Sequence, residues 1–311
     1  MSTLKIGLAL GSGAARGWAH IGVINALKKK GIEADIVCGT SIGALVGAAH
    51  VSNNLKKLQR AVTSLTKFET AKFFGIHSSL SGFVDKERLS DFFHQHVAAE
   101  DVLIENLDRQ YAAVATDLDS GREIWLSEGA IVDAVWASIA LPGIFHALKN
   151  NDKWLVDGGL VNPVPVSVCR ALGADVVIAV NLNGDLVGRH SQKEVSSEKS
   201  NHQDDSEKTG SRSVVDKISG LVADYASSAF SSANKEDQGP SLFNAIASSI
   251  NIVQDRITRS RMAGDPPDIV LSPKLPDIGL LEFYRAEEAI KEGADCVRRM
   301  MPEIRHVLEV D

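Results

Sequence analysis

Residues 36–49 read IVCGTSIGALVGAA, and this stretch predicts how the rest of the chain is arranged. Its β-branched start indicates a buried strand, and its run of small apolar residues indicates a helix. Between them, Gly39-Thr40-Ser41-Ile42-Gly43 has the Gly-x-Ser-x-Gly pattern of a nucleophile elbow. Because the turn is tight, the positions flanking the serine need residues without bulk, and Gly39 and Gly43 meet that need. The pattern predicts Ser41 as a nucleophile at the positive end of a helix, with a simple helix-capping role for Thr40 or Ser41 as the alternative.

A second glycine-rich segment, GSGAARG at residues 11–17, follows a short apolar strand that ends at Leu10. A dinucleotide-binding loop would need Gly-x-Gly-x-x-Gly, but Arg16 stands where the third glycine belongs. The next strand also leads to the serine elbow rather than to an acidic residue. A phosphate-binding P-loop would need Gly-Lys-Ser/Thr, which the segment lacks. Both nucleotide-binding interpretations are therefore rejected.

The same loop fits an oxyanion hole better. Small residues allow the backbone N–H groups of Gly11, Ser12 and Gly13 to point into one pocket beside Ser41, where they can stabilise negative charge. A plain strand-to-helix turn is the alternative, but it explains one or two of these residues rather than the whole segment. We predict these three amides as donors and Arg16 as a supporting residue.

A third segment joins an acidic residue to two glycines, because the predicted strand 153–156 is followed by Asp157-Gly158-Gly159. If this strand runs parallel to the strand before Ser41, its end is exposed at the same rim of the sheet. Asp157 is then the candidate base, with Gly158 and Gly159 as supporting residues. An aspartate that only caps an Asx turn is the alternative.

A serine nucleophile usually needs a base that accepts its hydroxyl proton, and in α/β-hydrolases this base is a histidine. The histidines after Asp157 are His190, His202 and His306, and none follows a strand as a triad requires. We therefore predict a dyad in which Asp157 bonds Ser41 directly. A carboxylate can serve as the base if burial raises its pKa.

Other segments allow two interpretations each. Asp117 ends the strand 111–116 of a predicted hairpin with residues 123–127, either as a supporting site residue or as a turn cap. Residues 52–110 carry apolar residues at helical spacing, which favours core packing over an acyl-chain pocket. The pair His94 and His96 lacks further metal ligands and is assigned to the surface.

Composition narrows the classes of function. The 311 residues carry a net charge of −7, which argues against nucleic acid as a partner and against electrostatic docking on anionic lipid. Three widely spaced cysteines suggest neither a disulfide framework nor a metal site, and no metal or organic cofactor is expected. No segment has the pattern of a signal peptide or a transmembrane helix. We expect a cytoplasmic protein and leave open a transient contact with the inner face of the membrane.

We expect three regions along the chain: a catalytic core over residues 1–184, a polar and mobile insert over 185–262, and a last strand with C-terminal helices over 263–311. The insert carries two amphipathic helices that form a lid, touch a membrane, bind a partner or pack on the core. After a strand at 268–271, helices are predicted at 284–300 and 304–308.

Taken together, these segments resemble the patatin-like phospholipase family, close to its small bacterial RssA-type members. The resemblance covers about residues 4–182, with a further familiar stretch at 261–268. It implies an α/β protein with a three-layer α/β/α fold, a mostly parallel sheet, a Ser41–Asp157 dyad and a glycine-loop oxyanion hole. Two departures are Ser12 in place of a middle glycine and Gly159 in place of a common alanine. The motifs that carry the resemblance are Gly11-Ser12-Gly13-Ala14-Ala15-Arg16-Gly17, Gly39-Thr40-Ser41-Ile42-Gly43, Asp117, Leu141-Pro142-Gly143 and Asp157-Gly158-Gly159.

The predicted function is a serine acyl-ester hydrolase of the phospholipase or lysophospholipase kind, acting on a lipid or another acyl ester. Two alternatives use the same frame. An acyltransferase would pass the acyl group from Ser41 to an alcohol, and a regulatory protein would bind a protein partner through residues 185–260.

Overall fold

Eight strands form one mixed sheet in the computed structural model, which describes residues 4–73, 86–184 and 242–309. The strands are β1 (Ile6–Leu10), β2 (Ile36–Thr40), β3 (Gln110–Asp117), β4 (Glu123–Leu126), β5 (Leu148–Asn150), β6 (Lys153–Asp157), β7 (Val176–Val180) and β8 (Ile269–Leu271). Their order is β5-β6-β3-β2-β1-β7-β8, and β4 pairs with β3 outside this path. The five strands from β3 to β8 run parallel, whereas β4, β5 and β6 form antiparallel pairs.

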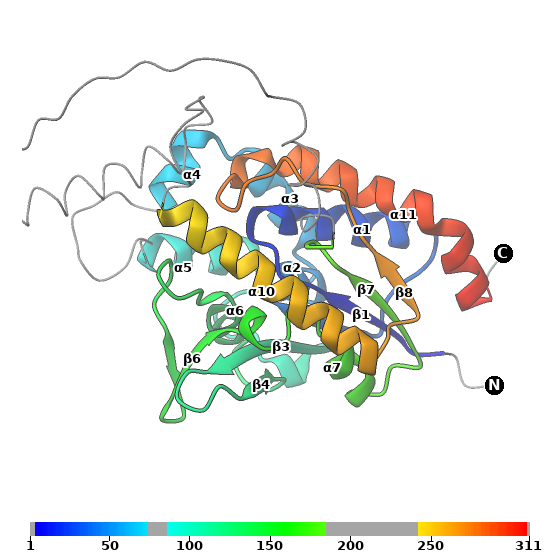
Figure 1. Ribbon diagram of the computed structural model, residues 1–311, viewed down its shortest axis with the longest axis horizontal. Helices are drawn as coiled ribbons and strands as arrows, with labels where there is room; N and C mark the ends of the chain where they lie inside the picture. Colours follow the sequence, from blue (N-terminus) through cyan, green and yellow to red (C-terminus); the bar gives the residue numbers. More distant parts are fainter. Residues whose placement is uncertain (1–3, 74–85, 185–241, 310–311) are drawn as a thin grey trace, which may run out of the picture.

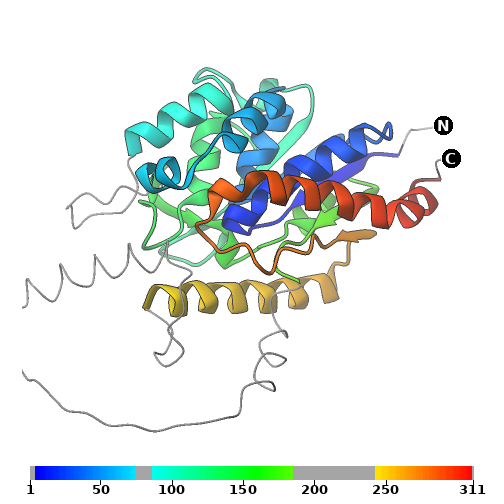
Figure 2. The same ribbon diagram turned by 90° about the horizontal axis from the view of Figure 1, so that it is seen from above.

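Helices cover both faces of this sheet (Figures 1 and 2). The longer ones are α1 (Ala19–Lys28), α2 (Ile42–Val51), α3 (Leu55–Thr63), α4 (Lys67–Phe73), α5 (Lys86–His96), α6 (Ile131–Ile139), α7 (Val166–Ala171), α10 (Leu242–Gly264) and α11 (Ala286–Leu308). Short 3₁₀ helices are η1 (Ala14–Trp18), η2 (Ile104–Asn106), η3 (Gly158–Leu160) and η4 (Phe283–Arg285). α1, α2, α6 and α11 pack on one face, and α7 and α10 lie on the other. The predicted three-layer α/β/α fold is confirmed.

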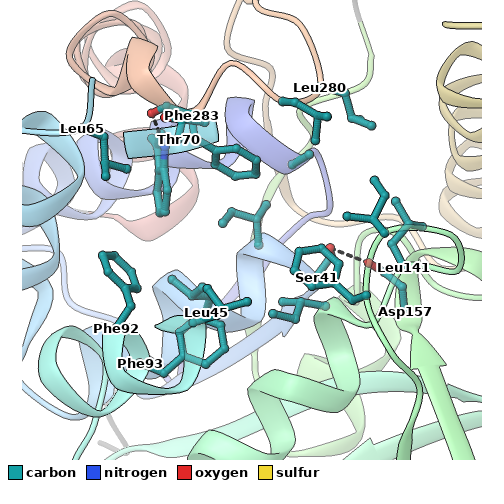
Figure 3. A pocket seen from close by; sticks show the side chains of 18 residues that line it. Ser41, Leu45, Leu65, Thr70, Phe92, Phe93, Leu141, Asp157, Leu280 and Phe283 are labelled. Carbon is teal, nitrogen blue, oxygen red and sulfur yellow. Dashed lines mark hydrogen bonds between the residues drawn. The ribbon is translucent and has the colours of Figure 1, made fainter. Parts of the chain in front are cut away.

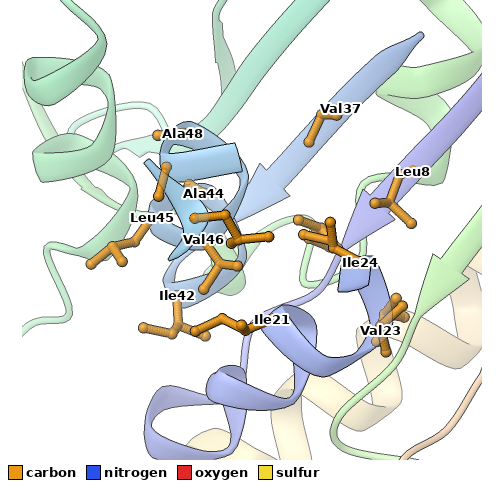
Figure 4. Packing of buried hydrophobic residues seen from close by; sticks show 14 of the residues in the cluster. Leu8, Ile21, Val23, Ile24, Val37, Ile42, Ala44, Leu45, Val46 and Ala48 are labelled. Carbon is orange, nitrogen blue, oxygen red and sulfur yellow. The ribbon is translucent and has the colours of Figure 1, made fainter. Parts of the chain in front are cut away.

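The two apolar layers follow from the alternation of side chains along the central strands. Leu8 and Val37 point toward α1 and α2, where they pack with Ile24 and Val46 (Figure 4). The neighbouring residue Cys38 points to the opposite face and packs with α7. A strand buried on both faces reads as a continuous apolar run, which is why the sequence of β2 predicted a buried strand.

The strand that carries Asp157 runs in the opposite direction to the one expected. β6 is antiparallel to β3, with Asp157 opposite Ala115, whereas β3 is parallel to β2, with Val114 opposite Thr40. β3 continues beyond the end of β2, and β6 pairs with that extension. Asp157 therefore lies at the rim next to Ser41 although β6 is separated from β2 by β3 and runs antiparallel to both. The assumption of a parallel strand is wrong, although it placed Asp157 at the same rim.

One C-terminal expectation differs from the structure as well. The predicted helices 284–300 and 304–308 are one helix, α11, with Pro302 inside it. A proline removes one backbone hydrogen bond, but the buried side chains of Val297, Ile304 and Leu308 continue one apolar face across it.

The predicted insert falls mostly outside the described residues. Its described end, α10, packs on the sheet through the partly buried Met262, which contacts the cluster of buried side chains near α7. Across residues 4–73, 86–184 and 242–309, no helix combines the length and the apolar character needed to cross a membrane.

Candidate active site

Ser41 occupies the sharp turn between β2 and α2. Its backbone has φ 57° and ψ −125°, a conformation that costs energy for a residue with a side chain. A Cβ atom at Gly39 would collide with the backbone of Ala44, and one at Gly43 would collide with the carbonyl oxygen of Leu10. Both glycines are therefore required by close backbone approach, as the sequence pattern predicted. The amide of Ser41 donates to the Oγ of Ser138, 2.8 Å away, which holds the turn against α6.

The structure brings Ser41 and Asp157 into direct contact (Figure 3). The Ser41 Oγ donates to the Asp157 Oδ2 at 2.6 Å, while the backbone N–H of Gly159 donates to Oδ1 at 2.7 Å. Asp157 is only 2 % exposed, whereas the sequence suggested an exposed position at the rim of the sheet. A Cβ at Gly158 would collide with the carbonyl oxygen of Val114, so this turn also needs a glycine. The two glycines after Asp157 thus allow the chain to turn closely around its carboxylate.

Burial sets the proton affinity of this carboxylate. Removal from water raises the pKa of Asp157 to about 6, against the opposing effect of the hydrogen bonds from Ser41 and Gly159. A carboxylate with this pKa is ionised at neutral pH and is a stronger base than an aspartate in water.

The glycine loop differs from the prediction at two of its three donors. The amide of Gly11 donates to the carbonyl oxygen of Val180 at 3.1 Å, and that of Ser12 donates to Pro163 at 2.8 Å. Neither N–H is free to bind an oxyanion, because each ties the loop to a neighbouring segment. The amides of Gly13 and Ala14 have no backbone acceptor within the described residues. Ala14 also lines the cavity next to Ser41, with a positive φ of 48°.

The Arg16 side chain connects the glycine loop to α10. Its guanidinium is buried, and its Nε donates to the carbonyl oxygen of Gly13 at 3.2 Å while Nη2 donates to Asn251 of α10 at 2.9 Å. Burial lowers the pKa of Arg16 to about 10, so the group stays charged at neutral pH. His20 supports the same loop, since its Nε2 lies 2.8 Å from the carbonyl oxygen of Gly11.

α10 contributes residues that sequence reasoning missed. Gln254 accepts from the Ser12 hydroxyl at 2.9 Å and from the Asn183 amide at 3.1 Å. A Cβ at Gly159 would collide with the Gln254 Nε2, so this side chain also packs on the turn after Asp157. The sequence signal was only a polar Asn251-x-x-Gln254 spacing within an amphipathic helix, and no short motif marks it.

Asp117 lies away from this group of residues. Its carboxylate accepts from the Ser120 hydroxyl at 2.7 Å and from the Asp119 amide at 3.2 Å within the hairpin turn. The turn-capping interpretation therefore describes its contacts, and Asp117 is not among the residues that line the cavity.

An apolar cavity of about 100 Å³ opens beside Ser41 and Asp157 (Figure 3). Leu65 and Phe92, from the helical region assigned mainly to core packing, line it, whereas Leu55 and Leu58 belong to the core. In the part of the chain that the structure describes, no group of three histidine, cysteine or acidic side chains could hold a metal ion. The cavity is lined by Ala14, Trp18, Ser41, Ile42, Leu45, Leu65, Thr70, Leu89, Phe92, Phe93, Ile139, Leu141, Ile144, Phe145, Asp157, Leu280, Leu281 and Phe283.

The fold and the elbow place the chain among α/β proteins with a serine on a strand–turn–helix junction. The sequence pattern of the family described as patatin-like phospholipase matches residues 8–170. An NTE family protein of Mycobacterium tuberculosis is 31 % identical over 343 residues, covering 100 % of this chain and 94 % of the relative. The chain belongs to the patatin-like phospholipase family.

Two further comparisons cover less or are more distant. The lysophospholipase NTE1 of Saccharomyces cerevisiae is 32 % identical over 191 residues, which is 58 % of this chain and 11 % of the yeast protein. The crystal structure of VipD from Legionella pneumophila aligns with a TM-score of 0.45 and 12 % identity, over 97 % of this chain and 67 % of that one.

Proposed function

We propose that this protein is a serine acyl-ester hydrolase of the phospholipase or lysophospholipase kind. The observation that carries the proposal is the 2.6 Å hydrogen bond from Ser41 Oγ to Asp157 Oδ2 at the edge of an apolar cavity. Membership of the family and the printed name of the yeast relative support a lipid acyl ester as the substrate class. The cavity suits an acyl chain because it offers apolar contact next to the nucleophile.

In the first half-reaction, Asp157 accepts the hydroxyl proton as Ser41 Oγ attacks the ester carbonyl carbon. The carbonyl oxygen takes the negative charge, and the amides of Gly13 and Ala14 are the proposed donors to it. This assignment replaces Gly11 and Ser12, whose amides are bonded elsewhere. Protonated Asp157 then gives its proton to the leaving alcohol, and the acyl group stays on Ser41.

In the second half-reaction, Asp157 takes a proton from water, and the resulting hydroxide attacks the acyl-enzyme carbonyl. The collapsing intermediate releases the free acid, and Ser41 Oγ recovers the proton held by Asp157. The cycle thus needs one carboxylate that is ionised at the start and protonated after each attack. A pKa near 6 suits both states at neutral pH.

The test combines a fluorophosphonate probe with a panel of phospholipids and lysophospholipids. Wild type should be labelled on Ser41 and should release fatty acid, and Ser41→Ala should do neither while keeping its fold by circular dichroism. Hydrolysis of the lipid panel by Ser41→Ala at the wild-type rate would contradict the proposal.

Acyl transfer is the second candidate, because the same acyl-enzyme can react with an alcohol in place of water. A lysolipid acceptor added to the assay separates the two outcomes. Hydrolysis yields free acid at all acceptor concentrations, whereas a transferase yields diacyl product at the expense of the acid.

A further inference from the structure

The polar groups that line the cavity can be accounted for one by one. Ser41 and Asp157 bond each other, and the indole N–H of Trp18 donates to the carbonyl oxygen of Phe283 at 3.1 Å. Among the described residues that line the cavity, the remaining polar side chain is Thr70 of α4. It is 1 % exposed, and its hydroxyl has no hydrogen-bond partner among the described residues.

The state of this hydroxyl differs from that of a matched residue on the neighbouring helix. Thr63 of α3 donates its Oγ1 to the carbonyl oxygen of Gln59, four residues earlier, at 2.9 Å. Thr70 also has the helical bond from its own amide to Thr66, at 2.9 Å, but its hydroxyl does not make the corresponding bond. A threonine in a helix can satisfy its hydroxyl locally, and Thr70 does not.

A buried hydroxyl without a partner is unfavourable, so its presence in an apolar lining points to a group that arrives from outside the chain. Figure 3 places Thr70 near Leu65 and Phe283, across the cavity from Ser41. Phe92 also lines this cavity. A charged or multiply polar head group would lose its hydration among these side chains, whereas an acyl chain would not.

We propose that Thr70 is a specificity-determining residue that hydrogen-bonds an oxygen on the acyl chain of the substrate, such as a hydroxyl or keto group. The preferred substrates are then esters of oxygenated fatty acids, with the scissile carbonyl at Ser41 and the second oxygen at Thr70. This inference rests on the proposed hydrolase function and narrows its substrate class. Each substrate oxygen would meet one partner, and the methylene groups between them would meet the apolar lining.

The experiment uses p-nitrophenyl esters of one chain length, either unsubstituted or with a single hydroxyl moved along successive carbons. With wild type, one hydroxyl position should raise kcat/KM about tenfold over the unsubstituted ester, because the buried hydroxyl gains its partner there. Thr70→Val, which has nearly the same shape, should lose this preference. Thr70→Ser should retain the preference.

The unsubstituted ester separates this inference from the proposed function. If wild type cleaves it and Ser41→Ala does not, the hydrolase assignment stands whatever happens at Thr70. The inference is overturned if no hydroxyl position is preferred by wild type, or if Thr70→Val shows the same position preference as wild type.

Discussion

Two environments meet at Ser41, and they are built in different ways. On the cavity side of Ser41 lie leucine, isoleucine and phenylalanine side chains, which are held in place by packing. The side facing α10 is polar. There the Ser12 hydroxyl donates to Gln254, and the Arg16 guanidinium donates to Asn251 and to the carbonyl oxygen of Gly13. In Figure 3 the Ser41–Asp157 pair lies between the cavity and α10. The difference suggests that the polar side sets catalytic geometry and proton affinity, and the apolar side sets which chain fits.

The largest expected effect comes from Asp157→Asn, which removes the base and keeps the size of the side chain. The asparagine cannot accept the proton of Ser41, so we expect kcat/KM to fall by about 10³-fold or more. Ester hydrolysis by the purified variant measures this loss. Activity within tenfold of wild type would show that Asp157 is not the base, and the assignment of proton transfer to the polar side of the site would then fail.

The same substitution should make the protein more stable at alkaline pH. The pKa of Asp157 is about 6 in the folded chain against its ordinary value of 3.8, so its ionisation opposes folding. That cost is complete above the folded pKa and disappears below the unfolded one. We expect Asp157→Asn to raise the free energy of unfolding by up to about 3 kcal/mol at pH 8 and by nearly nothing at pH 3.5. Urea unfolding at the two pH values tests the sign, and a variant less stable than wild type at pH 8 would contradict it.

The second effect concerns the backbone of the elbow. A Cβ at Gly43 would collide with the Leu10 carbonyl oxygen, whereas at Gly47, one turn later, its nearest neighbour would be a Val37 methyl group at 3.1 Å. We expect Gly43→Ala to lower kcat/KM by about 100-fold and to destabilise the fold by about 3 kcal/mol, because the turn must shift. Gly47→Ala is the matched control and should have a much smaller effect in the same assays. Equal losses in the two variants would show that helix packing, not the turn, limits activity.

A third and smaller effect tests the polar side directly. Gln254→Glu keeps an oxygen for Ser12 but places a second carboxylate near Asp157, and like charge raises the pKa of the first. We expect the acidic limb of the kcat/KM profile, near pH 6 in wild type, to move up by about one unit, with a loss of about threefold at pH 6.5 that fades at pH 9.

Thr258→Val on the same helix is the control for this shift, since Thr258 is buried but bonds none of the loop residues. Its acidic limb should stay where wild type has it. A Gln254→Glu profile that superimposes on that of the control would show that α10 acts on the site only through packing.

The smallest effect is expected on the apolar side. Leu45 lines the cavity one turn after Ser41, and Leu45→Ala should enlarge the space without moving the dyad. We expect a shift of the preferred acyl length by about two carbons, with kcat/KM changes of a few-fold and an unchanged acidic limb. A series of p-nitrophenyl esters from butyrate to myristate measures it. If the acidic limb moved and the length preference did not change, the apolar side would set proton affinity rather than chain length, which contradicts the comparison.

The sequence predicted the parts of the site that depend on short motifs. Gly39, Gly43 and Gly158 are required by backbone atoms a few residues away or on the adjacent strand, whereas Gly159 meets the side chain of Gln254 on α10. Strand direction was harder to predict, since a short run such as residues 153–156 reads the same in a parallel or an antiparallel pair. The antiparallel return of β6 depends on its pairing with β3, about 40 residues earlier in the chain.

For a related reason, the sequence could not show which amides of the glycine loop are already bonded to the backbone. The loop offers several consecutive amides, and which of them are used depends on acceptors at Val180 and Pro163. The contribution of Gln254 is equally non-local, because it lies 242 positions after the serine that it bonds. Such contacts leave no spacing pattern near the motif that they support.

The position of α10 has a consequence for the minimal catalytic unit. A polypeptide cut after residue 184 would retain the nucleophile, the aspartate and the whole glycine loop, and it would still contain the matched family segment 8–170. It would lack Asn251 and Gln254, so the guanidinium of Arg16 and the hydroxyl of Ser12 would each lose a partner in the interior. The shortest active fragment is therefore expected to extend at least through residue 264, well past the end of the recognisable motifs.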